Sequence, residues 1–128
     1  MPTLEVFLPE GHTVNTKAEL ISALTDATVN SIGAPAESVR LLLNEMPGSN
    51  FGIGGKTATD GAPPSLPVIL AILIAGRTEQ QKSALIAALS NSCAHVLSAP
   101  LASIRVMIKD IPNTDFGIAG LTAKALGR

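Results

Sequence analysis

An internal repeat constrains the fold of this 128-residue chain more than any other feature. Residues 2–58 align without a gap with residues 67–123, and identical residues recur along the whole alignment. Each repeat begins with a proline, has an Ala-Pro pair near its middle, and has Phe-Gly-Ile near its end. The repeat predicts two copies of one supersecondary unit, which must share a core because units of about 60 residues are marginal alone.

The repeat also predicts how the chain is divided. Residues 1–58 form the first unit and residues 67–128 the second. Between them, residues 59–66 read TDGAPPSL, and this content of Gly, Pro and Ser is typical of an irregular linker. We therefore expect one compact domain with pseudo-twofold symmetry.

Each unit has the pattern of a strand, a helix and a second strand. The first strands are expected at residues 3–8 and 66–74, and the continuous apolar run of the latter predicts burial on both faces. The second strands are expected at residues 39–46 and 104–111. Strand-helix-strand units of this length favour parallel pairing with a right-handed crossover.

The helix ends are marked by capping and by proline. Capping-box spacing, in which a Thr precedes Glu or Gln by three residues, occurs at Thr16 with Glu19 and at Thr78 with Gln81. Downstream, Pro35 and Pro100 are expected to stop the helices. We predict an α/β fold in which two tandem βαβ units form a four-stranded sheet with two helices on one face. Other subunits should then cover the remaining apolar sheet face.

Composition excludes several classes of function. Nine Lys and Arg against ten Asp and Glu give a net charge of -1, and the three Phe are the only aromatic residues, so nucleic-acid binding has no support. The uncharged run at residues 61–76 is too short to span a membrane, and no signal peptide is apparent. The single cysteine, Cys93, lies on an apolar helical face and is expected to be an inert thiol. These features predict a cytoplasmic protein.

Pro2 is the candidate base. Met1 before a small residue is usually removed in cells, which would expose a secondary amine at the start of a buried strand. Burial or neighbouring cations would lower the pKa of that amine towards neutrality and suit it to proton transfer. The alternative is that Pro2 simply begins a strand, where proline is tolerated.

Three arginines are candidate ligands for a carboxylate. Arg40 and Arg105 occupy the same repeat position in otherwise apolar strands, where a cation needs an acidic partner. That partner is either an organic acid or a structural one, such as Glu45, Asp110 or an acid of another subunit. Arg77 follows Gly76, whereas the first unit has His12 at this position.

Phe51 and Phe116 share one repeat position within the segments FGIGG and FGIAG, whose glycines permit a tight turn. Each phenylalanine either packs in the core or keeps water from a substrate. The two histidines have no partners at the spacing of a metal site or a catalytic triad, and no phosphate-binding loop is present. We expect neither a metal nor an organic cofactor.

In their order and spacing, these motifs resemble the 4-oxalocrotonate tautomerase family. The resemblance covers both units and is best in the second, through Gly76-Arg77-Thr78, Ala99-Pro100, Ser103-Ile104-Arg105-Val106 and Phe116-Gly117-Ile118. The chain is similar to a fused form of the family's short subunits. This implies a homotrimer that rebuilds a hexamer-like assembly.

The resemblance implies an isomerase that interconverts enol and keto forms of an unsaturated 2-oxo acid such as 2-hydroxymuconate. Pro2 would be the general acid and base, while Pro67 could not serve because its nitrogen is an internal amide. Arg77 and Phe116 of the second unit would serve Pro2, together with Arg105 or Arg40 of a neighbouring chain. His12 would face Pro67, so its divergence from arginine would cost nothing.

Two alternatives stay open. One is a hydratase or dehalogenase of the same superfamily, which would need a carboxylate to activate water. Asp115, beside Phe116, is the nearest candidate for that role. The other is a trimeric protein that binds carboxylates without turnover.

Overall fold

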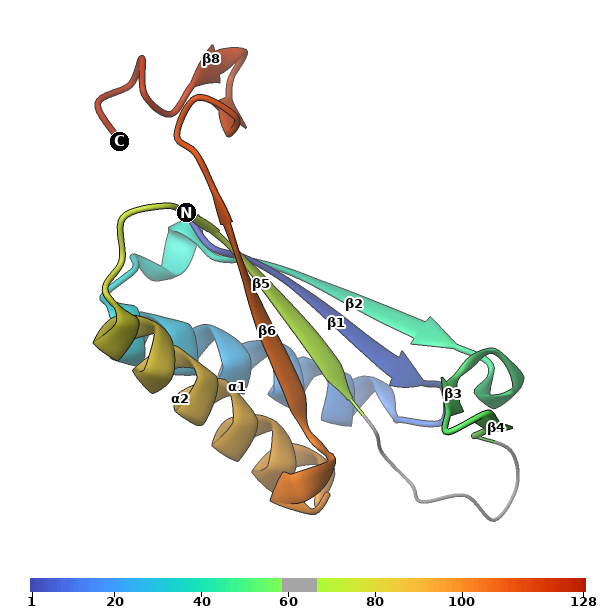
Figure 1. The fold of residues 1–128 in the computed structure, drawn as a ribbon. Helices are drawn as coiled ribbons and strands as arrows, with labels where there is room; N and C mark the ends of the chain where they lie inside the picture. Colours follow the sequence, from blue (N-terminus) through green and yellow to red (C-terminus); the bar gives the residue numbers. More distant parts are fainter. Residues whose placement is uncertain (59–66) are drawn as a thin grey trace.

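The fold is a four-stranded sheet with two helices packed on one face (Figure 1). The computed structural model describes residues 1–58 and 67–128, so the expected linker at 59–66 lies outside the described residues. The strands of the sheet are β1 (Thr3–Pro9), β2 (Arg40–Met46), β5 (Val68–Ile74) and β6 (Arg105–Ile111), in the order β2-β1-β5-β6. The helices are α1 (Val14–Ile32) and α2 (Glu79–Leu97). The predicted fold class is confirmed.

The pairing directions relate the two units by an approximate twofold axis. β1 is parallel to β2, and β5 is parallel to β6, as strand-helix-strand units predict. β1 and β5 meet in the middle of the sheet as an antiparallel pair, with Thr3 opposite Ile72. Because of this register, the first strand of each unit begins beside the end of the first strand of the other unit.

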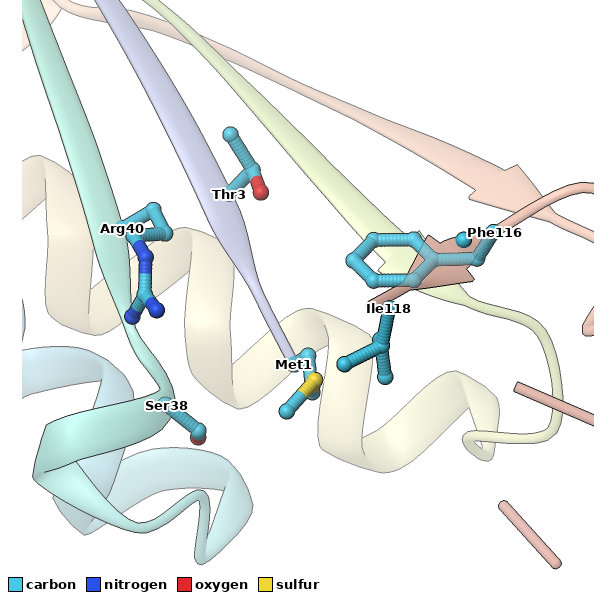
Figure 2. A pocket seen from close by; sticks show the side chains of 7 residues that line it. Met1, Thr3, Ser38, Arg40, Phe116 and Ile118 are labelled. Atoms are coloured by element: carbon cyan, nitrogen blue, oxygen red, sulfur yellow. The ribbon is translucent and has the colours of Figure 1, made fainter. Parts of the chain in front are cut away.

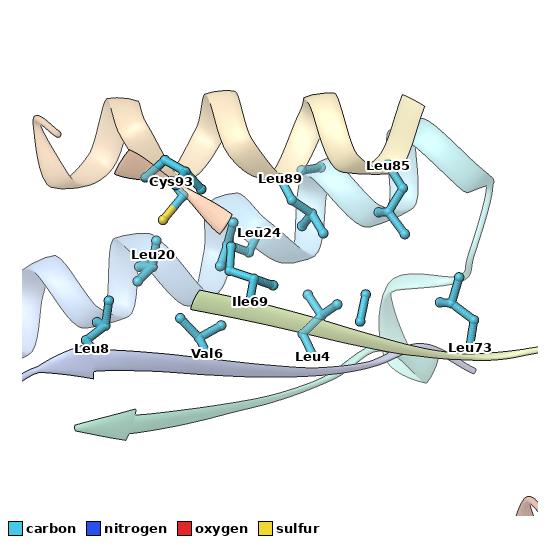
Figure 3. Packing of buried hydrophobic residues seen from close by; sticks show 13 residues of the cluster. Leu4, Val6, Leu8, Leu20, Leu24, Ile69, Leu73, Leu85, Leu89 and Cys93 are labelled. Atoms are coloured by element: carbon cyan, nitrogen blue, oxygen red, sulfur yellow. The ribbon is translucent and has the colours of Figure 1, made fainter. Parts of the chain in front are cut away.

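The core lies between the sheet and the helices (Figure 3). Alternate residues of β1 and β5 point toward the helices and meet the apolar faces of α1 and α2, where Leu20, Leu24, Leu85, Leu89 and Cys93 are fully buried. Burial raises the pKa of the Cys93 thiol to about 11, so this group is neutral and not nucleophilic at neutral pH. The prediction of an inert core thiol is confirmed.

The opposite sheet face carries apolar side chains that no helix covers. In β5, residues 69, 71 and 73 are buried while residues 68, 70 and 72 are only half-buried, so the prediction of a strand covered on both faces is wrong for the single chain. On the two outer strands, Leu42 and Met107 are each 52% exposed. This face is called the open face below.

The helix starts match the prediction only in the second unit. Thr78 caps α2 in a complete capping box with Gln81. In the first unit the predicted box at Thr16 is wrong, because Thr13 is the N-cap and its hydroxyl accepts a hydrogen bond from the Thr16 amide at 3.1 Å. A capping box needs Glu or Gln three residues after the N-cap, to accept a hydrogen bond from the N-cap amide. In the first unit that position is Thr16, so the box cannot form.

The helices end before the prolines that were expected to stop them. The C-cap residues are Gly33 and Ser98, both left-handed, at φ 69° and φ 50°. The downstream Pro35 and Pro100 instead begin short 3-10 turns that lead into β2 and β6. The left-handed cap, rather than proline, terminates each helix.

Replacing Ser98 with glycine should stabilise the protein. The Ser98 side chain is at a left-handed position that glycine adopts without steric cost, so we expect Ser98→Gly to raise the free energy of unfolding by about 0.5–1 kcal/mol. Urea unfolding monitored by circular dichroism would measure the change. The matched control is Gly33→Ser, which should lower the free energy of unfolding by a similar amount, because Gly33 is also left-handed. A Cβ at Gly33 would meet no atom within 4 Å, so no steric clash would add to this cost. Equal stability of all three proteins would contradict the assignment.

Two small hairpins lie at opposite ends of the sheet (Figure 1). One comprises β3 (Gly52–Ile53) and β4 (Lys56–Thr57), and the other comprises β7 (Gly117–Ile118) and β8 (Leu121–Thr122). Both turn through two residues with positive φ, which is the hairpin geometry that glycine favours. Phe51 directly precedes the first hairpin, and Phe116 directly precedes the second. Among the described residues, no helix is long and apolar enough to cross a membrane.

Candidate active site

The sheet register brings Arg77 next to the start of the chain. β5 runs antiparallel to β1, so the residues that follow Ile74 lie beside the residues that precede Thr3. Gly76, at φ 131°, turns the chain out of β5 in a conformation that favours glycine. Arg77 follows, and its Nη1 donates a hydrogen bond to the Ile74 carbonyl at 3.3 Å. His12 follows β1, so the same register places it at the end of the sheet where β5 begins.

The hairpin of the second unit completes a pocket at this end of the sheet. This amine pocket has a volume of about 180 Å³ and is lined by Met1, Thr3, Ser38, Arg40, Phe116 and Ile118, among others. Figure 2 shows Arg40 and Ser38 on one side of Met1, with Phe116 and Ile118 on the other. The first unit thus supplies the chain start and a guanidinium group, and the second unit supplies an apolar wall.

A neighbouring pocket shares Met1 and adds two cations. This arginine pocket, of about 450 Å³, is lined by Met1, Ser38, Gly76, Arg77 and Arg128, among others. Among the described residues, neither pocket has an Asp or Glu side chain in its lining. Burial, followed by the charges of Arg77 and Arg128, holds the pKa of the Met1 amino group below its ordinary value. The neutral form of an amine is therefore favoured here more than in water, and the two arginines attract anions.

Pro2 itself is fully buried at the start of β1, and its carbonyl accepts a hydrogen bond from the Arg40 amide at 3.0 Å. Met1 precedes it in the structure, so the Pro2 nitrogen is an amide here. Pro67 is equally buried, and its carbonyl accepts the equivalent bond from the Arg105 amide at 3.2 Å. The two prolines differ in the bond that precedes them. Removal of Met1 would free the Pro2 nitrogen as an amine, whereas the Pro67 nitrogen stays an internal amide.

Arg40 and Arg105 do not pair with the acids proposed for them. Glu45 binds Lys17 at 2.8 Å, and Asp110 binds Lys82 in the equivalent position. The two guanidinium groups donate instead to backbone carbonyls, from Arg40 to Glu37 at 3.0 Å and from Arg105 to Ala102 at 2.7 Å. The alternative in which Glu45 or Asp110 pairs with these arginines is wrong, because each of the two acids binds a lysine of a helix.

The predicted site residues fall into two groups in the chain. Arg40, Arg77 and Phe116 all line pockets that include Met1. Arg105 lies with Phe51 in a separate pocket at the other end of the sheet. Phe51 is only 8% exposed, whereas Phe116 is half-buried, so Phe51 packs mainly in the core and lines its pocket with its small exposed part.

Sequence reasoning missed Ser38 and Arg128. Ser38 lines both pockets at Met1, and its hydroxyl donates to the Pro35 carbonyl at 2.7 Å. Its recurrence as Ser103 in the second unit was the available signal. Arg128 lies beyond the aligned repeat, so no internal comparison could identify it. The Asn113 side chain holds its carbonyl at 3.0 Å.

The described residues offer little support for a metal or for water activation. No group of three or more His, Cys, Asp or Glu side chains that could hold a metal ion occurs within residues 1–58 and 67–128. Asp115 accepts a hydrogen bond from the Thr114 hydroxyl at 2.8 Å and does not line the amine pocket. Asp115, the candidate carboxylate for a hydratase, therefore does not lie in the pocket beside Met1.

Comparison with known protein families gives two matches to one profile. The family described as Tautomerase enzyme matches residues 2–61 and again residues 67–125. A probable tautomerase of Ralstonia nicotianae is 47% identical over 55 residues, which cover 43% of this chain and 79% of that protein. A 2-hydroxymuconate tautomerase of Pseudomonas putida is 43% identical over 63 residues, which cover 49% of this chain and all of that protein.

Solved structures match along nearly the whole chain. A native fused 4-OT is 71% identical with a TM-score of 0.95, covering 98% of this chain and 99% of that chain. A fused 4-OT described as an asymmetric trimer is 68% identical with a TM-score of 0.91, at the same coverage. Another, described as a symmetric trimer, is 40% identical with a TM-score of 0.90, again at the same coverage.

Proposed function

Because the chain belongs to the tautomerase family and is an isomerase, we propose that it interconverts the enol and keto forms of an unsaturated 2-oxo acid such as 2-hydroxymuconate. One observation carries the proposal. The start of the chain lies in a pocket with a guanidinium group and an apolar wall, and the adjoining pocket adds two more arginines. We also propose that the chain consists of two tautomerase-like units, residues 1–58 and residues 67–128, which form one domain.

The proposed base is the Pro2 nitrogen after Met1 has been removed. Removal would convert the amide to a secondary amine and would also vacate the space that Met1 occupies in both pockets. The amine would accept the enol proton and leave a dienolate, with negative charge on the 2-oxygen. The oxygen electrons would then form the carbonyl as the π electrons shift along the carbons to take up a proton. The resulting ammonium would return the proton to a carbon, so the reaction needs no other reactant.

The proposed binding groups are the arginines and Phe116. Arg77 and Arg40 would bind carboxylate and stabilise the negative charge that develops on the 2-oxygen, since both line pockets at the chain start. A further arginine, either Arg105 or Arg40 of a neighbouring chain, could reach this site only across a subunit interface. Phe116 would exclude water, which strengthens these electrostatic contacts.

The proposed assembly is a homotrimer. Its support is the exposed apolar surface of the open face, together with the trimeric state stated for two related fused proteins. Burial of such a face against other copies would account for the apolar run in β5.

Charged substitutions on the open face should dissociate the trimer. We expect Leu42→Asp and Met107→Asp to shift the mass measured by light scattering from about three chains towards one, because an unpaired carboxylate is costly to bury. Val14→Asp is the matched control, since Val14 is 77% exposed at the start of α1 and should tolerate the charge. A mass that stays trimeric in both open-face variants would place the interface elsewhere.

The function is tested by ultraviolet detection of ketonisation, on protein whose intact mass shows that Met1 is absent. The substrates are 2-hydroxymuconate, a diacid, and phenylenolpyruvate, a monoacid. We expect rapid turnover, and the preference between the two substrates would report how many arginines take part. If protein with a free prolyl amine ketonised neither substrate, that result would contradict the proposal.

A further inference from the structure

A second pocket lies at the other end of the sheet, where the pseudo-twofold axis places it. This Arg105 pocket, of about 380 Å³, is lined by Phe51, Ile53, Val68, Ser103 and Arg105, among others. These residues are the repeat equivalents of Phe116, Ile118, Thr3, Ser38 and Arg40, which line the amine pocket. Duplication has therefore produced two pockets of similar construction in each chain.

The two pockets differ in the groups that chemistry requires. Pro67 directly precedes β5 inside the chain, so its nitrogen is a tertiary amide with no basic lone pair. The position of Arg77 is taken by His12, which the antiparallel register brings to this end of the sheet. The Arg105 pocket thus keeps a cation and an apolar wall but has neither a prolyl amine nor a second arginine in its lining.

Two backbone carbonyls orient the guanidinium group of Arg105. Its Nη1 donates to the carbonyls of Ala102 at 2.7 Å and Ile104 at 3.1 Å, and these are the only hydrogen bonds of its guanidinium group among the described residues. Its Nε and Nη2 donors are therefore left to an incoming acceptor. The described lining includes no Asp or Glu to compete for them. A fixed, planar set of donors suits a carboxylate, and the adjoining Phe51 suits an apolar tail.

We propose that the Arg105 pocket binds small organic monocarboxylates without converting them, so that each chain has a binding-only site besides the amine pocket. The contrast with a catalytic amine pocket rests on the proposed function, whereas carboxylate binding at Arg105 does not depend on it. A single guanidinium group favours a monoacid, because a second carboxylate would be desolvated without a partner. Occupancy of this pocket should be independent of turnover.

The three phenylalanines of the chain provide a direct readout. In protein labelled with 4-fluorophenylalanine, Phe51 reports on the Arg105 pocket and Phe116 on the amine pocket, while Phe7 lines neither. Single Phe→Leu variants would assign the fluorine signals. Crotonate is the probe, because it is a monocarboxylate that lacks the 2-oxo group, and crotonamide is its neutral control.

We expect crotonate to shift the Phe51 signal saturably and crotonamide to leave it unchanged. Arg105→Ala should weaken the crotonate response of Phe51 at least tenfold, and Pro2→Ala should preserve it. A Phe51 signal that ignores crotonate would overturn the proposal. Loss of the Phe116 response in Arg105→Ala, with the Phe51 response intact, would also overturn it, since Arg105 would then serve the amine pocket of another chain.

A matched pair of variants keeps the test decisive if Arg105→Ala folds poorly. Ile53 and Ile118 occupy equivalent pocket positions, and Ile53 is 54% exposed, so a carboxylate is tolerated there sterically. Ile53→Glu should abolish the Phe51 response alone, and Ile118→Glu the Phe116 response alone. A Phe51 response that survives Ile53→Glu would refute the site. Ketonisation of 2-hydroxymuconate, measured separately, decides the proposed function.

Discussion

Pro2→Ala should lower kcat/KM for 2-hydroxymuconate by about 10²- to 10⁴-fold, the range that a positioned general base contributes. The variant keeps an amine, because Met1 before alanine is also removed. However, it replaces a rigid secondary amine, which the strand orients, with a primary amine that rotates freely. Steady-state ultraviolet kinetics on protein of verified mass would measure the loss.

Pro67→Ala is the matched control for this prediction. Pro67 is as fully buried as Pro2 and begins the equivalent strand, so its substitution has similar consequences for packing. Its nitrogen is an internal amide, and we expect kcat/KM to change no more than about threefold. Equal losses in both variants would indicate a structural role for the two prolines, and no loss in Pro2→Ala would remove the proposed base.

The repeat predicted most of the architecture because its symmetry carries information that single elements lack. The strand-helix-strand order in both copies was enough to predict the four-stranded sheet and the helices on one face. The predicted burial of β5 on both faces was wrong for one chain because apolar content does not distinguish a core from a subunit interface. Sequence shows that a face must be covered, but it does not show by which chain.

The site was predicted less completely than the fold. The family resemblance implied that Arg77 and Phe116 would meet the chain start, and both line pockets that include Met1. The partners of Arg40 and Arg105 were not predictable, since they are carbonyls of the preceding turns, and every residue has a carbonyl. Arg128 was missed because it has no counterpart within the repeat. Helix capping at Thr13 was missed because the spacing rule was applied to the wrong threonine.

The difference between Arg77 and His12 yields the second large effect. We expect Arg77→Ala to lower kcat/KM by about 10- to 100-fold, the loss of one or two charge-assisted hydrogen bonds to substrate. His12→Ala should leave kcat/KM nearly unchanged, because His12 lies at the end of the sheet where Pro67 begins β5. These two residues share a repeat position, so each variant controls for the other. The reverse pattern of losses would assign the catalytic site to the other end of the sheet.

The pH profile of Arg77→Ala should separate two roles of Arg77, which are its effect on the pKa of the amine and its binding of substrate. Burial, followed by the Arg77 charge, lowers the pKa of the Met1 amino group, and we expect the same charge to disfavour the protonated Pro2 amine once Met1 is removed. Removing that charge raises the pKa, and since only the neutral amine acts as base, the acidic limb of kcat/KM should move to higher pH. Arg77→Lys keeps the charge but loses the planar set of donors, so its acidic limb should stay in place while kcat/KM still falls. Identical limbs in Arg77→Ala and the parent enzyme would show that Arg77 binds substrate without tuning the base.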